Sequence, residues 1–246
     1  MLNIIIVGIN GRMGRTLYDL AGEKGINVVC GVDKSISGEF NCPVFRDFDE
    51  VKEYADVIVD FSSPDTIFAL GEYATQTNCK LVLCATGYTD DENGYIRHIS
   101  EKTAVFKSAN TSYGVAVLDR LCSVAAELLV GYDANITEIH HSEKKDSPSG
   151  TAKELYKTIS AAGGANIRRE SIYSLRCGNV TGEHKVGFYG QNEAVILSHT
   201  AYSKELFADG AIKCAEFIVD KPAGLYTIDD LISDKMKSRI YKGSSH

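Results

Sequence analysis

Over the first 110 residues, short continuous runs of apolar, mostly β-branched residues alternate with segments of helical length. The runs cover residues 3–7, 27–32, 56–60, 80–84 and 103–107, and segments such as 12–24 and 64–76 lie between them. Strands that are apolar on both faces are typical of a parallel sheet with helices on each side. The pattern therefore predicts an α/β domain with a doubly wound parallel sheet.

After residue 110 the pattern changes. Apolar residues recur at helical spacing over 118–129, a strand follows at 134–142, and a second amphipathic helix runs to Gly163. A capping-box spacing of Thr151 and Glu154 marks the start of that helix. Strands at 171–176, 184–189 and 194–202 then follow without helices between them, which predicts a second, α+β domain with a mixed or antiparallel sheet. We expect a first domain of residues 1–110, completed by the tail 213–246, and a second of residues 111–212.

Composition narrows the possible classes of protein. The net charge of −7 argues against a general nucleic-acid or membrane-surface binder, because both favour a basic face. No apolar run reaches the roughly 18 residues needed to span a bilayer. The seven cysteines are odd in number, scattered and free of C-x-x-C pairs, so we expect mostly buried thiols rather than disulfides or a zinc site. With no signal peptide visible before the first strand, we expect a cytoplasmic protein.

A glycine pattern follows the first strand. Gly8, Gly11 and Gly14 form a G-x-x-G-x-x-G motif before a helix, and Asp33 ends the second strand nineteen residues later. These features predict a Rossmann-type dinucleotide site, with the pyrophosphate at the helix N-terminus and the carboxylate on the adenosine ribose. Asp33 favours NADH, while Lys34 could neutralise a 2′-phosphate, so NADPH remains open. The cofactor-binding candidates here are Gly8, Asn10, Gly11, Arg12, Met13, Gly14, Asp33 and Lys34.

Later strands of such a sheet end at the same crevice. We therefore expect further cofactor-binding residues at three strand ends: Phe61, Ala85, Thr86, Gly87, Ser108, Ala109 and Asn110. Gly87 is the strongest of these, because no turn requirement visible in the sequence explains a glycine there.

Ionisable groups crowd into residues 138–151, where a strand turns into a helix. Neighbouring strand residues point to opposite faces, so His140 and His141 do not share a metal, and no third ligand is suitably spaced. We expect no metal. His140 or Lys144 could instead supply a proton, and the helix entrance at Ser149, Gly150 and Thr151 could hold a carboxylate.

The motifs taken together resemble the 4-hydroxy-tetrahydrodipicolinate reductase family of lysine and diaminopimelate biosynthesis. The similar segments are residues 8–14, 85–87, 138–152, 176–178, 182–184, 207–211 and 224–226. The chain departs from the family's more basic residues at Ser142, Glu143 and Lys204, and at the pair 62–63.

The resemblance implies reduction of a cyclic dicarboxylate by NADH or NADPH. It implies His140 and Lys144 as proton donors and His141, Ser149, Gly150 and Thr151 as substrate-binding residues. It also implies a homotetramer built through the second domain.

Two other functions remain open from the residues themselves. One is a different two-domain NAD(P)-dependent dehydrogenase. The other is a dinucleotide-sensing binding module without turnover, which leaves the crowded ionisable residues at 138–151 unexplained.

Overall fold

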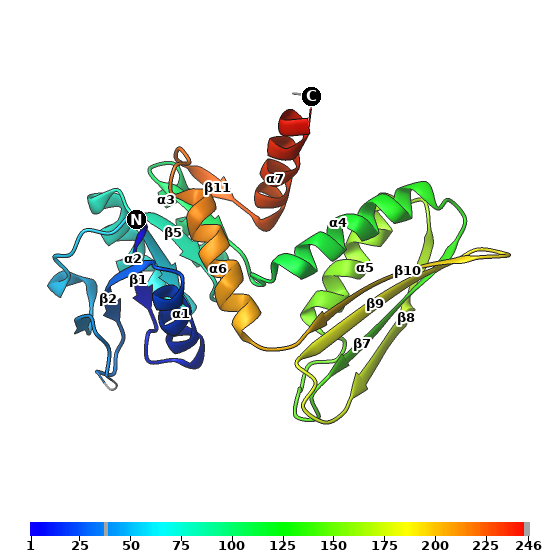
Figure 1. Cartoon of the computed structure of the whole chain (residues 1–246), viewed down its shortest axis with the longest axis horizontal. Coiled ribbons are helices and arrows are strands. Elements are labelled where there is room, and N and C mark those ends of the chain that lie inside the picture. Colours follow the sequence, from blue (N-terminus) through cyan, green and yellow to red (C-terminus); the bar gives the residue numbers. More distant parts are fainter. Residues whose placement is uncertain (37–38, 244–246) are drawn as a thin grey trace. The chain divides into compact units, whose positions relative to one another are not determined.

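The computed structural model describes residues 1–36 and 39–243 and divides the chain into two compact units (Figure 1). The first unit comprises Met1–Thr111 and the segment that begins at Glu205. The second comprises Ser112–Lys204. Each unit has its own sheet.

The first unit is built on a seven-stranded sheet with the order β11-β6-β5-β4-β1-β2-β3, in which every recorded pairing is parallel. This confirms the doubly wound α/β fold. The strands are β1 (Asn3–Val7), β2 (Asn27–Val32), β3 (Val44–Phe45), β4 (Val57–Asp60), β5 (Lys80–Leu83), β6 (Ala104–Lys107) and β11 (Gly224–Tyr226). The chain order reverses between β1 and β4, and open α/β sheets bind ligands at such a point.

Helices cover both faces of this sheet. They are α1 (Arg12–Glu23), α2 (Ile67–Thr77), α3 (Asp90–Ser100) and α6 (Glu205–Ile218), with short 3-10 turns η1 (Phe48–Glu50) and η2 (Pro64–Thr66). The last helix, α7 (Ile228–Gly243), follows β11 and contacts α6. Helices α1 and α6 lie side by side (Figure 1). Apolar residues of α2 and α3, including Ile67, Leu70 and Ile96, pack against Ile5, Ile58 and other strand residues. Strands β1 and β4 are therefore buried on both faces, which explains their continuous apolar sequence.

The second unit has a four-stranded mixed sheet with the order β10-β9-β7-β8. Its strands are β7 (Asp133–His140), β8 (Asn166–Arg176), β9 (Gly182–Tyr189) and β10 (Ala194–Ala201). β7 pairs parallel with β8 and antiparallel with β9. Helices α4 (Tyr113–Leu128) and α5 (Gly150–Ala162) cover one face, where Leu118 and Leu155 pack with Ile136 and Phe188 (Figure 1).

The start of α5 differs from the sequence prediction. Ser149 is the N-cap, and its Oγ accepts a hydrogen bond from the backbone N–H of Ala152 at 3.2 Å. The predicted Thr151–Glu154 capping box is therefore wrong, because Thr151 already lies inside the first turn. Gly163 ends the helix at a φ of 74°, as predicted.

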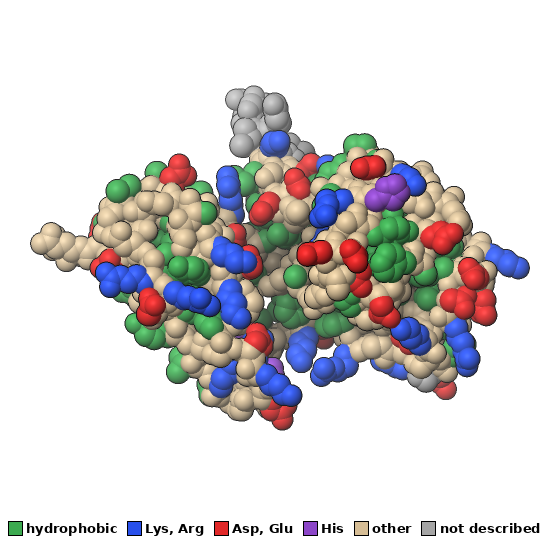
Figure 2. Space-filling view, turned by 180° about the vertical axis from the view of Figure 1, so that it is seen from behind, with side chains coloured by type: hydrophobic (Ala, Val, Ile, Leu, Met, Phe, Trp, Pro, Cys, Tyr) green, Lys and Arg blue, Asp and Glu red, His purple; other side chains and the backbone are tan. Residues whose placement is uncertain are grey.

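Surface charge and helix composition can be compared with the expectation of no nucleic-acid or membrane partner. In Figure 2, Lys and Arg side chains lie among Asp and Glu side chains on the face shown. Within residues 1–36 and 39–243, no helix combines the length and the apolar character needed to cross a membrane.

Candidate active site

The glycine motif forms the predicted tight turn between β1 and α1. Gly8 has a φ of +76°, and its N–H donates to the carbonyl of Val32 at 2.8 Å. A Cβ on Gly14 would stand 2.1 Å from the carbonyl oxygen of Gly8, so only glycine lets the helix approach the strand this closely. Among the described residues, no side chain caps the start of α1 at Gly11. Its N-terminus therefore suits an anionic phosphate.

The Asp33 side chain joins the end of β2 to the glycine turn. Its Oδ2 accepts from the backbone N–H of Asn10 at 3.0 Å, and its Oδ1 accepts from the N–H of Ser35 at 3.0 Å. Asn10 in turn contacts Arg15, whose Nε donates to the Asn10 carbonyl at 3.1 Å. Asn10 thus supports the turn from within, and Asp33 is held beside the glycines as the ribose-binding role requires.

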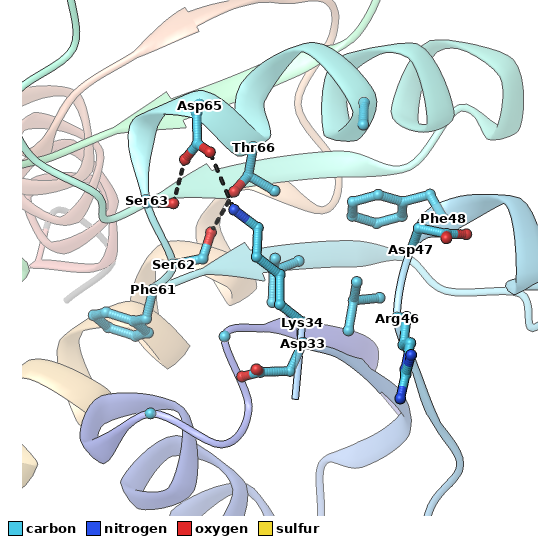
Figure 3. Close-up of a pocket in the computed structure, with 15 residues that line it drawn as sticks. Asp33, Lys34, Arg46, Asp47, Phe48, Phe61, Ser62, Ser63, Asp65 and Thr66 are labelled. Carbon is cyan, nitrogen blue, oxygen red and sulfur yellow. Dashed lines mark hydrogen bonds and ion pairs between the residues drawn. The ribbon is translucent and has the colours of Figure 1, made fainter. Parts of the chain in front are cut away.

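A cavity of about 450 Å³ opens at this end of the sheet (Figure 3). It is lined by five of the predicted cofactor residues: Gly8, Gly11, Asp33, Lys34 and Phe61. Lys34 reaches across to Asp65, with Nζ and Oδ2 3.2 Å apart (Figure 3). This cation is therefore already paired. The glycine turn, the uncapped helix and the Asp33 carboxylate fit the adenosine half of a dinucleotide.

The cavity also contains Arg46, which sequence analysis missed. Arg46 follows β3 directly, and the N–H of Asp33 donates to the carbonyl of Phe45 at 2.9 Å. Arg46 has no ion-pair or hydrogen-bond partner within the described part of the chain. The sequence signal for Arg46 would have been a strand at Val44–Phe45, which pairs with the end of β2 and so brings Arg46 to the cavity. Two residues are too few to show strand periodicity.

Asp60, at the end of β4, is fully buried and shapes the next turn. Its Oδ1 accepts from the N–H of Ser62 at 2.8 Å, while its Oδ2 has no partner among the described residues. Burial raises the pKa of Asp60 to about 6, although the Ser62 hydrogen bonds oppose this shift. The turn packs closely on the glycine motif, since a Cβ on Gly8 would lie 3.1 Å from the Cα of Ser62.

The remaining predicted cofactor residues lie outside the lining of this cavity. Ala85, Thr86 and Gly87 follow β5, and Ser108, Ala109 and Asn110 follow β6, so both groups come after carboxyl ends of the same parallel sheet. Arg12, Met13 and Gly14 belong to α1. Gly87 has a φ of +88°, so its backbone conformation itself favours glycine. The sequence argument that no turn explained this glycine is wrong.

In the second unit, His140 ends β7 and is almost entirely buried. Its Nδ1 is hydrogen-bonded to Oε2 of Glu138, two residues earlier on the same face of the strand. Arg176, from β8, donates to both oxygens of Glu138, at 2.9 Å each. A Cβ on Gly182 would stand 3.1 Å from Nε2 of His140, so this glycine keeps the space beside that nitrogen open.

Lys144 lies in the loop after β7, where its Nζ is 2.8 Å from Oδ1 of Asp146. Arg176 holds this loop as well, because Nε donates to the Lys144 carbonyl at 3.3 Å and Nη2 donates to the Asp146 carbonyl at 2.6 Å. His141 is the first residue after β7 and is partly exposed, whereas His140 is buried. The two histidines thus have different surroundings, but the predicted strand to residue 142 is too long: β7 ends at His140, so strand alternation does not reach His141.

The start of α5 is joined to the same cluster. The N–H of Ser149 donates to Oε1 of Glu138 at 3.2 Å, and Oγ of Ser149 lies 3.2 Å from Nε2 of His184. His184 comes from β9, and its ring meets that of His140 edge to face at 5.1 Å between centroids. Gly150 is exposed and Thr151 partly exposed in the first helical turn. A carboxylate at this turn would meet the positive end of the helix.

The cluster's electrostatics favour an ionised Glu138 and neutral histidines. Burial alone would raise the pKa of Glu138, but hydrogen bonds from Arg176, Ser174 and His140 outweigh it and lower the pKa to about 2. Burial lowers the pKa of His140 despite the opposing effect of Glu138, and burial lowers that of His184 to about 4. No group of three His, Cys, Asp or Glu side chains in the described ranges is arranged as metal ligands.

Sequence reasoning brought His140, Lys144 and the α5 entrance together but gave no role to the residues that join them. Glu138, Arg176 and His184 appeared only within family-like segments. A buried position for Glu138 could have been read from strand alternation, since it lies two residues before His140. The pairing with Arg176 needs the register of β7 against β8, which the sequence does not reveal.

The two halves of the chain match two models of one family. The model described as "Dihydrodipicolinate reductase, N-terminus" matches residues 2–111, and that described as "Dihydrodipicolinate reductase, C-terminus" matches residues 114–232. A 4-hydroxy-tetrahydrodipicolinate reductase of Caldanaerobacter subterraneus subsp. tengcongensis is 38% identical, over 94% of this chain and 98% of the relative. One of Clostridium tetani is 36% identical, over 95% and 98%.

Solved structures show the same fold. A dipicolinate-bound dihydrodipicolinate reductase from Paenisporosarcina sp. TG-14 aligns with a TM-score of 0.80 at 22% identity, covering 92% of this chain and 97% of that one. A diaminopimelate dehydrogenase of C. glutamicum is more distant, with a TM-score of 0.58 at 14% identity, over 94% and 98%. Both family models and the curated relatives confirm the resemblance seen in the motifs, and the chain belongs to the dihydrodipicolinate reductase family.

Proposed function

We propose that the chain is an NAD(P)H-dependent 4-hydroxy-tetrahydrodipicolinate reductase that forms tetrahydrodipicolinate in lysine and diaminopimelate biosynthesis. The observation that carries this proposal is the cluster in the second unit. There a buried histidine, the loop that carries Lys144 and the Ser149-capped entrance of α5 are joined, directly or through Arg176, to one ionised carboxylate. The seven unpaired cysteines are compatible with a reducing cytoplasm, where we place the enzyme.

The roles in the second unit follow from charge and position. Lys144 and the N–H groups of Gly150 and Thr151 offer positive charge to a substrate carboxylate, with His141 and Ser149 beside them. His140 and Lys144 are the proposed proton donors, because each has an ionisable nitrogen and both are joined to the α5 entrance through Glu138 and Arg176. The bound nicotinamide would supply the hydride. The protein's own task is to place the dicarboxylate and to move the proton.

The first unit is the proposed nucleotide domain, and the second the substrate and assembly domain. Asp33 supports NADH, because a carboxylate beside the ribose would repel a 2′-phosphate. Lys34 gives less support to NADPH than its sequence position suggested, since its ammonium is paired with Asp65. Arg46 supplies a second cation at the same end of the cavity. We therefore propose NADH or NADPH as the cofactor. The residues that bear on the choice, Asp33, Lys34 and Arg46, all line this cavity.

A coupled assay tests the function directly. The purified chain is mixed with NADH or NADPH and with the fresh product of dihydrodipicolinate synthase, and the loss of nicotinamide absorbance is followed. We expect oxidation that requires the synthase product and saturates with each nucleotide added separately.

The control omits the synthase. If both nucleotides bind but neither is oxidised, the chain is a dinucleotide-binding module. Oxidation with a different substrate class, and none with the synthase product, would instead favour another two-domain dehydrogenase.

We further propose a homotetramer assembled through the second unit. The face of its sheet opposite α4 and α5 exposes large apolar side chains, including Tyr173 at 56%, Leu175 at 49% and Ile196 at 44%. Exposed apolar side chains gathered on one sheet face are typical of an interaction surface.

Light scattering should give about four times the chain mass of 26.8 kDa. Leu175→Lys would put a charge on this face, so we expect a smaller assembly. Leu128→Lys, on an exposed position of α4, is the matched control. A wild-type chain that is monomeric at micromolar concentration contradicts the tetramer.

A further inference from the structure

Glu138 is the point at which three separate parts of the proposed site meet. The side chain is completely buried, yet both carboxylate oxygens are fully used. Oε2 contacts Nδ1 of His140 and one Arg176 nitrogen, while Oε1 contacts the other Arg176 nitrogen and the N–H of Ser149. Buried carboxylates are retained only where such partners compensate for the lost hydration. Removing this one charge would therefore disturb His140, the Lys144 loop and the start of α5 together.

The contact with Glu138 determines which nitrogen of His140 carries the proton. An ionised carboxylate accepts hydrogen bonds only, so Nδ1 of His140 must be the N–H donor. In the neutral ring, Nε2 then holds a lone pair. That nitrogen faces the space that Gly182 leaves open. His140 can accept a proton at Nε2 and later donate it without turning its ring.

Charges of both signs act on His140. Glu138 on its own strand favours the imidazolium form. Arg176 from β8 and Lys144 from the following loop oppose it, and Lys144 is partly neutralised by Asp146. His184 from β9 contacts the ring but is itself neutral because burial holds its pKa near 4. Burial decides the balance in the free protein and lowers the pKa of His140.

We propose that Glu138, held by Arg176, is the positioning residue of this site: it fixes the Nδ1–H tautomer of His140, so that Nε2 takes up a proton from solvent when a dicarboxylate binds. The bound ligand brings negative charge beside Lys144 and the α5 entrance, where it offsets the cations that oppose the imidazolium form. Substrate binding itself thus prepares the acid. This inference rests on the proposed function only for the identity of the ligand.

The tautomer can be measured on the wild-type protein. In ¹⁵N-labelled protein, the ring nitrogens of His140 are assigned by comparison with His140→Gln, and their chemical shifts distinguish a protonated from an unprotonated nitrogen. We expect Nδ1–H with an unprotonated Nε2 in the free protein near neutral pH. A neutral ring protonated at Nε2 overturns the proposal, without the need for a variant that folds.

Proton uptake is measured by calorimetry with dipicolinate as the probe, in two buffers that differ in ionisation enthalpy. The wild type should take up a substantial fraction of one proton per dipicolinate bound. Glu138→Gln removes the charge with little change of shape, so uptake should fall by at least half. Its turnover should fall about tenfold, with the alkaline limb of the pH profile moved to lower pH, because the proton-donating imidazolium loses its counter-charge. Glu127→Gln, on an exposed position of α4, is the matched control.

Uptake that is unchanged in Glu138→Gln, or absent from the wild type while dipicolinate binds, overturns the inference. Because an unpaired Arg176 can unfold Glu138→Gln, Arg176→Lys is tested beside it. Lysine keeps one positive charge but loses the two-pronged contact with Glu138, and we expect a partial loss of proton uptake.

The two proposals fail separately. A wild type with the expected tautomer and uptake but without turnover refutes the proposed reductase, and one with turnover but the other tautomer refutes only the role of Glu138.

Discussion

His140→Gln is expected to lower kcat by at least about a hundredfold, the scale of a lost general acid. Glutamine keeps a side-chain amide near the Glu138 carboxylate, so the buried charge is not left without a donor. Glutamine has no titratable proton, however, and cannot replace the acid. KM for the dicarboxylate should change far less than kcat, because the proposed anion-binding groups are Lys144 and the start of α5. Steady-state kinetics in the coupled assay measure both quantities.

Lys144→Ala should lower kcat by a similar factor and also raise KM, since Lys144 serves as a proposed donor and as a cation for a carboxylate. Lys145→Ala is the matched control, because it removes the neighbouring, exposed lysine. We expect kcat and KM of Lys145→Ala to lie within about twofold of the wild-type values, because substitutions of exposed residues usually have small effects. Wild-type turnover in either His140→Gln or Lys144→Ala would refute that residue's assignment.

The fold of the first unit was predictable because its local signals agree. Continuous apolar runs mark strands buried on both faces, and the glycine turn marks the first strand-to-helix junction. β3 escaped prediction because two residues carry no periodicity. β11 is only three residues long, yet it pairs with β6 through Leu225 and Val105 at the edge of the sheet. Such pairing depends on partners more than a hundred residues away, which local patterns do not report.

The second unit shows where local patterns mislead. Thr151 and Glu154 have capping-box spacing, but Ser149 reaches the Ala152 N–H first and so begins the helix two residues earlier. The first unit holds a similar case, because Gly87 looked free of conformational demand until its positive φ was known. The spacing of polar residues in a sequence cannot decide between two nearby candidate N-caps, and it does not give backbone dihedral angles.

The ionisable cluster was found, but its organisation was not. The sequence placed His140, Lys144 and Ser149 within a short stretch, so their proximity needed no tertiary information. Arg176 lies 38 residues from Glu138 and meets it only through the parallel pairing of β7 with β8. The ion pair that joins the cluster therefore depends on the register of β7 against β8. A sequence motif shows which residues are present but not which of them are in contact.

Gly14→Ala is expected to weaken nucleotide binding by about a hundredfold or more, a loss on the order of 3 kcal/mol. A Cβ at this position would stand 2.1 Å from the carbonyl oxygen of Gly8 and 2.7 Å from the Cα of Ile9. Both are backbone atoms, so no rotamer change relieves the contact, and the turn or the helix must move. The displaced turn would also lose the Asn10 N–H contact to Asp33. Fluorescence titration with NADH and with NADPH measures the loss.

Gly22→Ala is the matched control in the same helix. No atom lies within 4 Å of the position its Cβ would take, and the site is exposed. Alanine should therefore stabilise α1 by about 0.5 kcal/mol through helix propensity and leave Kd unchanged. Thermal melts separate the two variants, because Gly14→Ala should lower Tm while Gly22→Ala should raise it slightly. If Gly14→Ala bound nucleotide as the wild type does, the close approach of α1 to β1 would not be what forms the phosphate site.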